Sequence, residues 1–596
     1  MALGVLGVGL AYAGGRWHDG WAPALYWIGE ITVFSPAAFV ALSGRSSWGQ
    51  RAGSVLIFAG AQSAITSAYS PTMFRYSDEL QNYRALLNVL LFHHDFHLNY
   101  SLPVSSAYPG LQDVTAAMTQ TTRLSPFVAG LILASIAYIL LGAALLLLYR
   151  GLGCGDRVAA VAGLVYALGT EQGLLRMFVY EALAVPFLVL ALHLATRSAE
   201  ARVVRPRSWK QLAGLAFGCI AVVTLTHHVT AIAEVGLLAL LGVAMATLRH
   251  HDLSARTMLL IDVAALGLLV IWIGVVAPTT LSYLGQPLEN ALSGAIAGHG
   301  AGTAAAPGAT GGPVEHALSL AGPLLTVVAV PVAIALVWRR RATYSLLSRL
   351  WVVGGLLFFA ALAVRVLAAN GAELGGRMLT YTSLFSSFAI ALVVDRLLCA
   401  RQLPTVGSIG RHRQSSRHRG LRAATGLAVT ILFLSGLLSG WPPYYERLPG
   451  TFHVDGFESG VDAANVSAAI WSQRALGTGN RVLGDFTAYT LWATLGDQDT
   501  VHGDNALYDA YQAATLSPQM AKAFEQLDVR YVETDERLAQ QAPVTGSYFP
   551  APGTAVRTKP LPPAALTKFD DAVGVSRIYD NGDIHLYDLR GSRYAS

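Results

Sequence analysis

The sequence predicts an α-helical polytopic membrane protein of about 13 transmembrane helices, followed by a C-terminal extracytoplasmic α/β domain. Of its 596 residues, 53% are hydrophobic and 13% charged, whereas a soluble globular protein carries about 25% charged residues. Long apolar runs recur as far as residue 440, and beyond it the balance changes from 29 Lys/Arg against 17 Asp/Glu to 12 against 19. We therefore expect a membrane domain over 1–440 and a separate domain over 441–596.

A membrane-spanning helix needs about 20 mostly apolar residues. Such runs occupy 1–14, 22–43, 52–70, 126–149, 157–172, 177–195, 211–228, 229–248, 257–277, 317–337, 350–369, 378–395 and 422–440. The first run is short and lacks the charged start and the cleavage site of a signal peptide, so we count it as a helix. The three cysteines are far apart in sequence and offer neither a disulfide framework nor a CxxC metal site.

The connecting loops predict the orientation. One alternating set of loops carries 22 Lys/Arg and the other carries six. Cytoplasmic loops are the basic ones, so 71–125, 278–316 and 441–596 are expected to be extracytoplasmic. The net charge of +5 mostly reflects these loops, including the Arg/His run 410–420 near anionic lipid, and we predict no nucleic-acid partner. The strong bias to Arg over Lys, with many Ala and Gly, indicates a GC-rich bacterial genome and hence a bacterial plasma membrane.

The first large outer loop, 71–125, contains two predicted helices at the membrane surface. Helical spacing of apolar residues over 78–91 predicts an amphipathic helix lying on the bilayer, with Ser77 as its N-cap. A second helix is expected to begin at Pro109. Asp78 and Glu79 fall in the first turn of the first helix. A carboxylate at this boundary is a competent general base for a sugar hydroxyl; alternatively, both residues only cap a surface helix.

This loop and the topology resemble the GT-C superfamily of integral-membrane glycosyltransferases. The matching stretches are RYSDE at 75–79 and YPGL at 108–111. The resemblance implies a GT-C-like fold, a polyprenyl-phosphate-linked sugar as donor, and an acidic catalytic motif in the first outer loop. It does not identify the sugar or the acceptor; a glycan, a lipid and a protein of the cell envelope all stay open as acceptors.

Polar side chains also gather at the predicted outer ends of other spans. The candidate substrate-binding residues are Tyr180, Glu181, His227, His228 and Glu234, and Arg176 is a candidate for donor phosphate. Ionisable groups inside a membrane are costly and are functional hypotheses by default. Arg176 and Tyr180, four residues apart, would share a helical face. Alternatively, Glu181 pairs with Arg176 to hold helices together, and His228 does the same with Glu234.

Arg377 closes the glycine-rich outer loop 368–379, where the 378–395 span begins. Arginine suits bidentate phosphate recognition, and a helix N-terminus adds affinity for anions. The glycines would let the backbone approach a ligand closely. The resemblance implies that such a basic group holds the lipid-linked phosphate, so Arg377 is our principal candidate for donor phosphate. The alternative is an anchor at headgroup level.

Two segments bear on cofactors and flexibility. His93, His94, Asp95 and His97 are types of residue that bind divalent metals, but no distant fourth ligand is evident. A divalent metal therefore stays open as a cofactor. The Gly/Ala/Pro stretch 291–313 is expected to be a flexible outer loop that orders when donor binds.

The last 156 residues alternate short apolar strands with helical stretches. We expect strands at 481–485 and 529–532, a helix over TAYTLWATLG, and a terminal hairpin that turns at Asn581-Gly582. This domain would bind carbohydrate or cover the membrane site as a lid.

These observations lead to one principal hypothesis: inverting glycosyl transfer at the outer membrane face. Asp78 would deprotonate the acceptor hydroxyl, Glu79 would assist it or bind a metal, and Arg377 would hold the departing phosphate. The alternatives are a transporter or flippase of lipid-linked sugars and a non-catalytic scaffold of envelope assembly.

Overall fold

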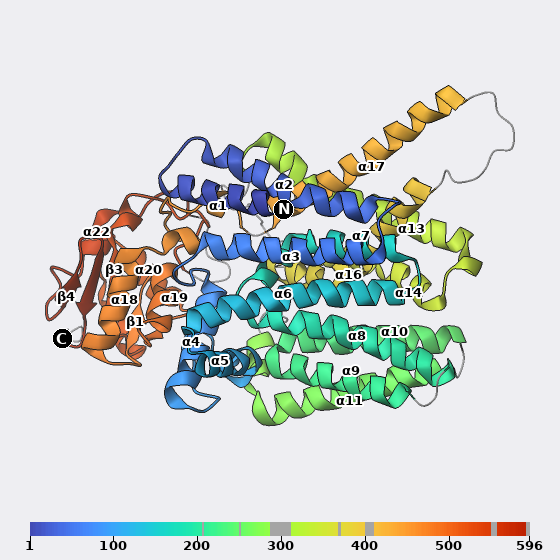
Figure 1. Cartoon of the computed structure of the whole chain (residues 1–596). Helices are drawn as coiled ribbons and strands as arrows, with labels where there is room; N and C mark the ends of the chain where they lie inside the picture. Colours follow the sequence, from blue (N-terminus) through green and yellow to red (C-terminus); the bar gives the residue numbers. More distant parts are fainter. Residues whose placement is uncertain are drawn as a thin grey trace.

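The computed structural model describes residues 1–204, 208–249, 252–285, 311–367, 371–399, 411–440, 442–549 and 557–591. Most of the chain forms one bundle of helices, and a smaller α/β domain caps one end of that bundle (Figure 1). The structure thus confirms the predicted fold class, a helical polytopic protein with a C-terminal α/β domain.

The bundle contains α1 (Ala2–Arg16), α2 (Ala22–Leu42), α3 (Trp48–Tyr69), α6 (Pro126–Gly151), α7 (Asp156–Ala167), α8 (Tyr180–Val204), α9 (Trp209–Thr226), α10 (His228–Arg249), α11 (Leu253–Ile271), α13 (Pro313–Arg339), α14 (Leu346–Gly354), α15 (Leu357–Leu367), α16 (Gly371–Cys399) and α17 (Arg411–Ser439). Each predicted span coincides with one of these helices, except that 350–369 is divided between α14 and α15. Within the described ranges, nine helices are long and apolar enough to cross a membrane. The protein is therefore a multi-pass membrane protein, while the number of about 13 spans stays a prediction.

Local sequence explains where several helices begin. A capping box starts α3, because the Ser47 side chain accepts from Gln50 N and the Gln50 side chain accepts from Ser47 N. Ser125 caps α6, and Pro126 occupies its first turn. The Arg/His run 410–420 was expected to be a loop, and this expectation is wrong: α17 begins at Arg411. Its arginines and its glutamine favour helix, and no proline interrupts them.

The outer segment 71–125 contains α4 (Ser77–Phe92), the 3₁₀ turn η1 (Pro103–Ala107) and α5 (Gly110–Thr122). The predicted helix 78–91 is therefore present, but Tyr76 is its N-cap and Ser77 its first residue. The position of α4 on the bilayer surface stays a prediction, but the polar face of the helix is not open to solvent. Arg84, Asn82 and Asn88 are buried because the C-terminal domain packs over α4 (Figure 1).

The C-terminal domain contains η5 (Tyr444–Glu446), η6 (Phe457–Gly460), α18 (Ala463–Leu476), β1 (Arg481–Leu483), α19 (Phe486–Thr494), β2 (Asp499–Thr500), α20 (Asn505–Gln512), α21 (Pro518–Gln526), β3 (Tyr531–Asp535), η7 (Glu536–Ala539), α22 (Pro563–Thr567), β4 (Ser576–Asp580) and β5 (Ile584–Asp588). The sheet order is β2-β1-β3-β5-β4. Strand β1 pairs in parallel with β2 and β3, and β5 pairs antiparallel with β3 and β4. The predicted hairpin is present, and Gly582 adopts the positive φ of 99° that its turn requires.

Two apolar cores hold this end of the molecule. One belongs to the C-terminal domain alone and includes Tyr508, Phe524 and Tyr587. The other is shared: Leu80 of α4 and Leu111 of α5 belong to the same core as Leu491, Trp492 and Tyr531. The outer segment and the C-terminal domain therefore lie together at one end of the bundle, as the predicted topology requires.

Candidate functional site

The first turn of α4 carries two adjacent carboxylates in different environments. Glu79 is buried, and its Oε1 accepts a hydrogen bond from Phe178 N at 3.1 Å. The backbone N–H groups of Arg75 and Tyr76 also donate to Glu79. Burial nevertheless raises the pKa of Glu79 to about 7, because removing a carboxylate from water outweighs these bonds. Glu79 thus ties the start of α4 to the segment before α8.

Asp78, by contrast, is partly exposed. Its charge acts on the hydroxyl of Tyr180 at the start of α8 and on that of Tyr489 in α19. Asp78 therefore lies where the bundle meets the C-terminal domain. Of the two carboxylates, Asp78 is the accessible one, so it is the stronger candidate for contact with a substrate.

Arg377 lies in a cluster of predicted site residues. Its charge acts on Tyr180, His227, His228 and Tyr381. These side chains come from α8, the α9–α10 connection and α16, which are far apart in sequence. The structure therefore brings the predicted phosphate-binding arginine together with three of the predicted substrate-binding residues.

The expected surroundings of Arg377 need correction. Helix α16 already begins at Gly371, so Arg377 lies inside the helix rather than at its N-terminus. The N-terminal anion affinity expected for it does not apply. The glycine at 375 serves helix packing: a Cβ there would lie 2.6 Å from Arg365 Cβ and 2.8 Å from Arg365 N. Glycine at 375 thus lets α15 and α16 approach closely.

A chain of hydrogen bonds joins the predicted residues of three helices. The Tyr381 hydroxyl donates to Glu181 Oε1 at 3.3 Å and lies 2.9 Å from Thr230 Oγ1. Thr230 Oγ1 lies 2.7 Å from His227 Nδ1. The His227 ring contacts that of Tyr180, with centroids 4.3 Å apart. This chain orients His227 and Glu181 beside Arg377. The alternative pairing of Glu181 with Arg176 is not formed, because Arg176 donates to Gln62 instead.

His228 begins α10 inside an aromatic enclosure. Its ring lies 5.1 Å from Tyr108 and 5.5 Å from Tyr283, and the Tyr108 hydroxyl is 2.8 Å from Thr280 Oγ1. Both ring nitrogens of His228 are buried, and no described residue forms a hydrogen bond with them. A buried polar atom without a partner is costly, so these nitrogens are available to a ligand.

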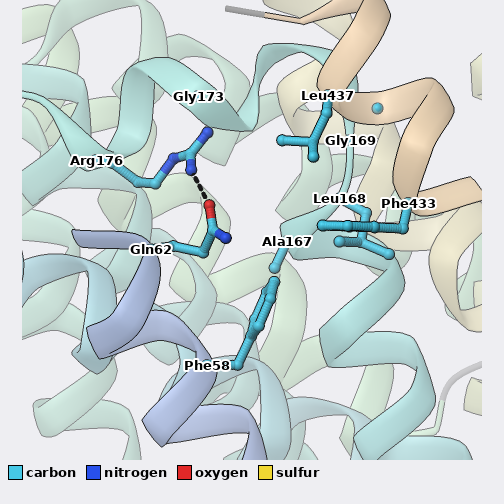
Figure 2. Close-up of a pocket in the computed structure, with 10 residues that line it drawn as sticks. Phe58, Gln62, Ala167, Leu168, Gly169, Gly173, Arg176, Phe433 and Leu437 are labelled. Carbon is cyan, nitrogen blue, oxygen red and sulfur yellow. Dashed lines mark hydrogen bonds between the residues drawn. The ribbon is translucent and has the colours of Figure 1, made fainter. Parts of the chain in front are cut away.

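Arg176 lies elsewhere. It ends the 3₁₀ turn η2 (Thr170–Arg176) and donates to Gln62 Oε1, and Gln62 donates to Glu30 Oε2 at 2.8 Å. Figure 2 shows Arg176 directed at Gln62. Met177 has an extended backbone with ψ of 167°, so Arg176 and Tyr180 do not share a helical face as expected.

Arg176 borders a small cavity that no residue of the Arg377 cluster lines. Arg176 and Glu79 line it together with Tyr12, Tyr69 and Glu458, and its volume is about 50 Å³. That volume accommodates a few water molecules and is too small for a sugar ring. Arg176 therefore lies with the polar groups of α2 and α3, away from the side chains around Arg377.

Glu234 also lies apart. It is buried, its electrostatic contact is with Cys219, and among the described residues neither carboxylate oxygen has a hydrogen-bond partner. It follows His228 by six positions, about 9 Å along a helix. The predicted pairing of His228 with Glu234 is not formed, because six residues place them on different faces of α10.

Within the described ranges, no group of three or more His, Cys, Asp or Glu side chains is arranged to bind a metal. In the segment 93–97, His97 stacks on Phe92 at 3.8 Å. Asp95 contacts Asp113, and burial together with the Asp95 charge raises the pKa of Asp113 to about 6. Residues 291–310 of the predicted flexible loop 291–313 lie outside the part of the chain that the structure describes.

Sequence reasoning missed five residues of this site: Thr230, Tyr283 and Tyr381 elsewhere in the membrane domain, Tyr108 between η1 and α5 in the outer segment, and Tyr489 in the C-terminal domain. Tyr108 begins the YPGL stretch that had been singled out, and Thr230 follows the His pair in THHVT. Tyr381 lies four residues after Arg377, one helical turn away. The sequence contains no comparable signal for Tyr489, because only the packing of α19 on α4 brings it near Asp78.

No family model matches the sequence. No curated protein matches it either. Solved structures do: the apo oligosaccharyltransferase of Archaeoglobus fulgidus has a TM-score of 0.56 at 14% identity, over 82% of this chain and 70% of that one. The same organism's oligosaccharyltransferase AglB, in complex with an inhibitory peptide and a dolichol-phosphate, has a TM-score of 0.53 at 14% identity over 82% and 69%.

A mutant form of the arabinofuranosyltransferase AftD from Mycobacteria has a TM-score of 0.51 at 14% identity. The match covers 90% of this chain and 41% of AftD. The bundle and its capping domain thus define a polytopic membrane protein with a polar site at one end. In particular, the chain has the fold of the GT-C membrane glycosyltransferases.

Proposed function

We propose that the protein is a GT-C-type glycosyltransferase that moves a sugar, with inversion, from a polyprenyl-phosphate donor to a cell-envelope glycan, lipid or protein. The observation that carries this proposal is the placement of Asp78: a partly exposed carboxylate within electrostatic reach of Tyr180, which belongs to the Arg377 cluster. The fold supports it, and a protein of similar fold has been solved with a dolichol-phosphate.

In this reaction Asp78 acts on the acceptor, and the Arg377 cluster acts on the donor phosphate. The Asp78 carboxylate takes the proton of the acceptor hydroxyl, while the oxygen of that hydroxyl forms a bond to the anomeric carbon of the donor sugar. The bond from that carbon to the phosphate oxygen breaks, and the phosphate leaves with the electron pair. Arg377 neutralises the phosphate, and His227 Nε2 and one ring nitrogen of His228 donate hydrogen bonds to its oxygens. Glu79 positions Asp78, because three backbone N–H groups already occupy its carboxylate.

The same proposal assigns the location. Residues 1–440 form the membrane domain of a bacterial plasma-membrane protein, and residues 441–596 form an extracytoplasmic domain. The distribution of Lys and Arg supports this orientation. The packing of the C-terminal domain on α4 supports placing it on the same side as the outer segment 71–125.

The decisive experiment compares Asp78→Asn with Asp95→Asn in purified protein in lipid nanodiscs. Asparagine keeps the shape of Asp78 but accepts no proton, so transfer from a radiolabelled polyprenyl-phosphate sugar should fall by about 10³-fold or more. Asp95→Asn, a partly exposed acid of the same outer segment, should retain activity. Near-normal transfer in Asp78→Asn contradicts the assignment. Translocation of the donor by the wild-type protein without bond cleavage would favour a transporter.

A further inference from the structure

The C-terminal domain presents a row of aromatic rings beside Asp78. Successive ring centroids are 6.1 Å apart for Tyr76–Phe457, 5.3 Å for Phe457–Phe486, 6.5 Å for Phe486–Tyr489 and 5.2 Å for Tyr489–His502. We call these five residues the aromatic row. It begins at the N-cap of α4, two positions before Asp78, and continues across the C-terminal domain.

The middle of this row is accessible. Tyr76 and Tyr489 are buried, whereas Phe457 and Phe486 are half-buried and His502 is exposed. Tyr489 is held in place because its hydroxyl donates to Ser101 O at 2.6 Å. The row thus combines buried members with two phenylalanine residues that are partly exposed.

The backbone holds the two phenylalanines firmly. Phe457 has a φ of 47° in the left-handed region, which is costly for a bulky side chain and persists where the surrounding structure enforces it. Phe486 begins α19: its N–H donates to Tyr548 O at 2.8 Å, and Asp485 caps the helix by accepting from Ala488 N at 2.8 Å. Strain kept at Phe457 is consistent with a functional position.

The row is directed toward the proposed base. The Tyr489 hydroxyl lies within electrostatic reach of both Asp78 and Tyr283, and Tyr283 in turn contacts the His228 ring. A ligand resting on Phe457 and Phe486 would therefore lie near the first turn of α4, which carries Asp78, on the side of the donor cluster that faces the C-terminal domain. The row contains no guanidinium or ammonium group, so it does not suit the donor phosphate.

We propose that the aromatic row is the acceptor subsite and that the acceptor is a carbohydrate. A sugar ring has an apolar face of C–H groups that packs on aromatic rings, and its hydroxyls at the ring edge can reach Asp78 and His502. A saccharide acceptor would place one hydroxyl at Asp78 while a neighbouring ring rests on Phe457 or Phe486. This inference rests on the proposed function and narrows its acceptor from three classes to one.

The test measures sugar binding without requiring turnover. Saturation-transfer-difference NMR of methyl α-mannopyranoside, methyl β-glucopyranoside and methyl α-arabinofuranoside is recorded on the protein in nanodiscs, wild type and Asp78→Asn. At least one probe should bind both. Phe486→Leu should reduce the signal at least fivefold, because leucine keeps apolar volume but loses the flat ring, and Phe486→Tyr should retain it.

The matched control is Tyr579→Leu. Tyr579 lies on β4, at the far edge of the sheet, and pairs with Trp471 at 4.7 Å in an equally half-buried ring pair. Sugar binding should survive this change; loss in Tyr579→Leu but not in Phe486→Leu overturns the proposal, as does the absence of binding by every probe. If sugar binding depends on Phe486 but the protein has no transfer activity, the proposed function is overturned and the aromatic row remains only a sugar-binding site.

Discussion

At the scale of the residue, Asp78 and Glu79 are adjacent in the first turn of α4, yet their carboxylates lie in different environments. Glu79 is buried and accepts from backbone N–H groups, while Asp78 is partly exposed and lies within electrostatic reach of Tyr180 in α8 and Tyr489 in α19. Adjacent positions in a first helical turn point about 100° apart. One therefore faces the protein interior and the other faces the site.

This difference predicts that Glu79→Gln retains most activity. The pKa of Glu79 is about 7, so it is already largely neutral in mildly acidic solution, and the glutamine carbonyl can still accept from Phe178 N. We expect transfer within about tenfold of wild type, against a loss of about 10³-fold for Asp78→Asn. Initial rates at pH 6 and pH 8 check this, and a loss equal to that of Asp78→Asn would make Glu79 the base instead.

A second residue-scale prediction concerns Arg377→Lys. Lysine keeps the positive charge but loses the planar, bidentate geometry that suits phosphate. The KM for the polyprenyl-phosphate donor should rise about tenfold or more, with a smaller change in the KM for the acceptor. Arg123→Lys, an exposed arginine at the end of α5, serves as control and should leave both constants unchanged. An unchanged donor KM in Arg377→Lys would remove Arg377 from the phosphate site.

At the scale of the element, α4 packs both on the helices α5 and α6 and on α19 of the C-terminal domain. Arg84 Nη2 lies 3.5 Å from Asp497 Oδ2, with both side chains buried, and Arg84 Nε donates to Asn88 Oδ1 at 2.7 Å. The C-terminal domain thus fixes the helix whose first turn carries Asp78. The amphipathic pattern of 78–91 predicts the helix correctly, but its polar face serves this interface rather than water.

Breaking that ion pair should loosen the interface. Asp497→Asn leaves Arg84 buried without its counter-charge, a loss of about 3–5 kcal/mol for a buried pair. Asparagine tolerates the φ of 53° at this position. The thermal unfolding midpoint of Asp497→Asn should fall clearly. Adding Arg84→Met to that variant removes the buried charge and should restore part of the lost midpoint. Asp499→Asn, which breaks the half-exposed Arg481 pair, should change the midpoint little; equal effects would contradict this account.

At the scale of the whole molecule, the stability of the C-terminal domain depends on buried acids. Asp455, Asp485, Glu533 and Asp535 are buried near Arg537, whose Nη2 donates to Asp535 Oδ2 at 2.7 Å. Burial, and then the charge of Asp535, raise the pKa of Asp485 to about 7 from an ordinary value of 3.8. Between these pH values the folded protein holds a proton that the unfolded chain releases.

That linkage sets the direction of the pH dependence. The stability contributed by a raised carboxyl pKa is present below pH 3.8 and is lost as the pH rises to about 7. The unfolding midpoint should therefore fall from pH 4 to pH 7. Asp485→Asn still caps α19 and should flatten this fall, as measured by thermal scans in buffers of matched ionic strength. An unchanged pH profile would show that Asp485 does not carry it.

The pattern of residues along the chain predicts the helical membrane fold, the α/β domain, the terminal hairpin and the place of Asp78 and Glu79 in the first turn of a helix, and the structure contains all four. Hydrophobic periodicity and charge are local along the chain, so they predict elements well. It did not determine which polar residues meet: the pairings of Glu181 with Arg176 and of His228 with Glu234 stood only as alternatives to a binding role. Only the tertiary structure separated those pairs, because helix rotation and the packing of α16 and α19 decide which side chains share a site. That packing is also what brings Arg377 and the C-terminal aromatic row to the same end of the bundle.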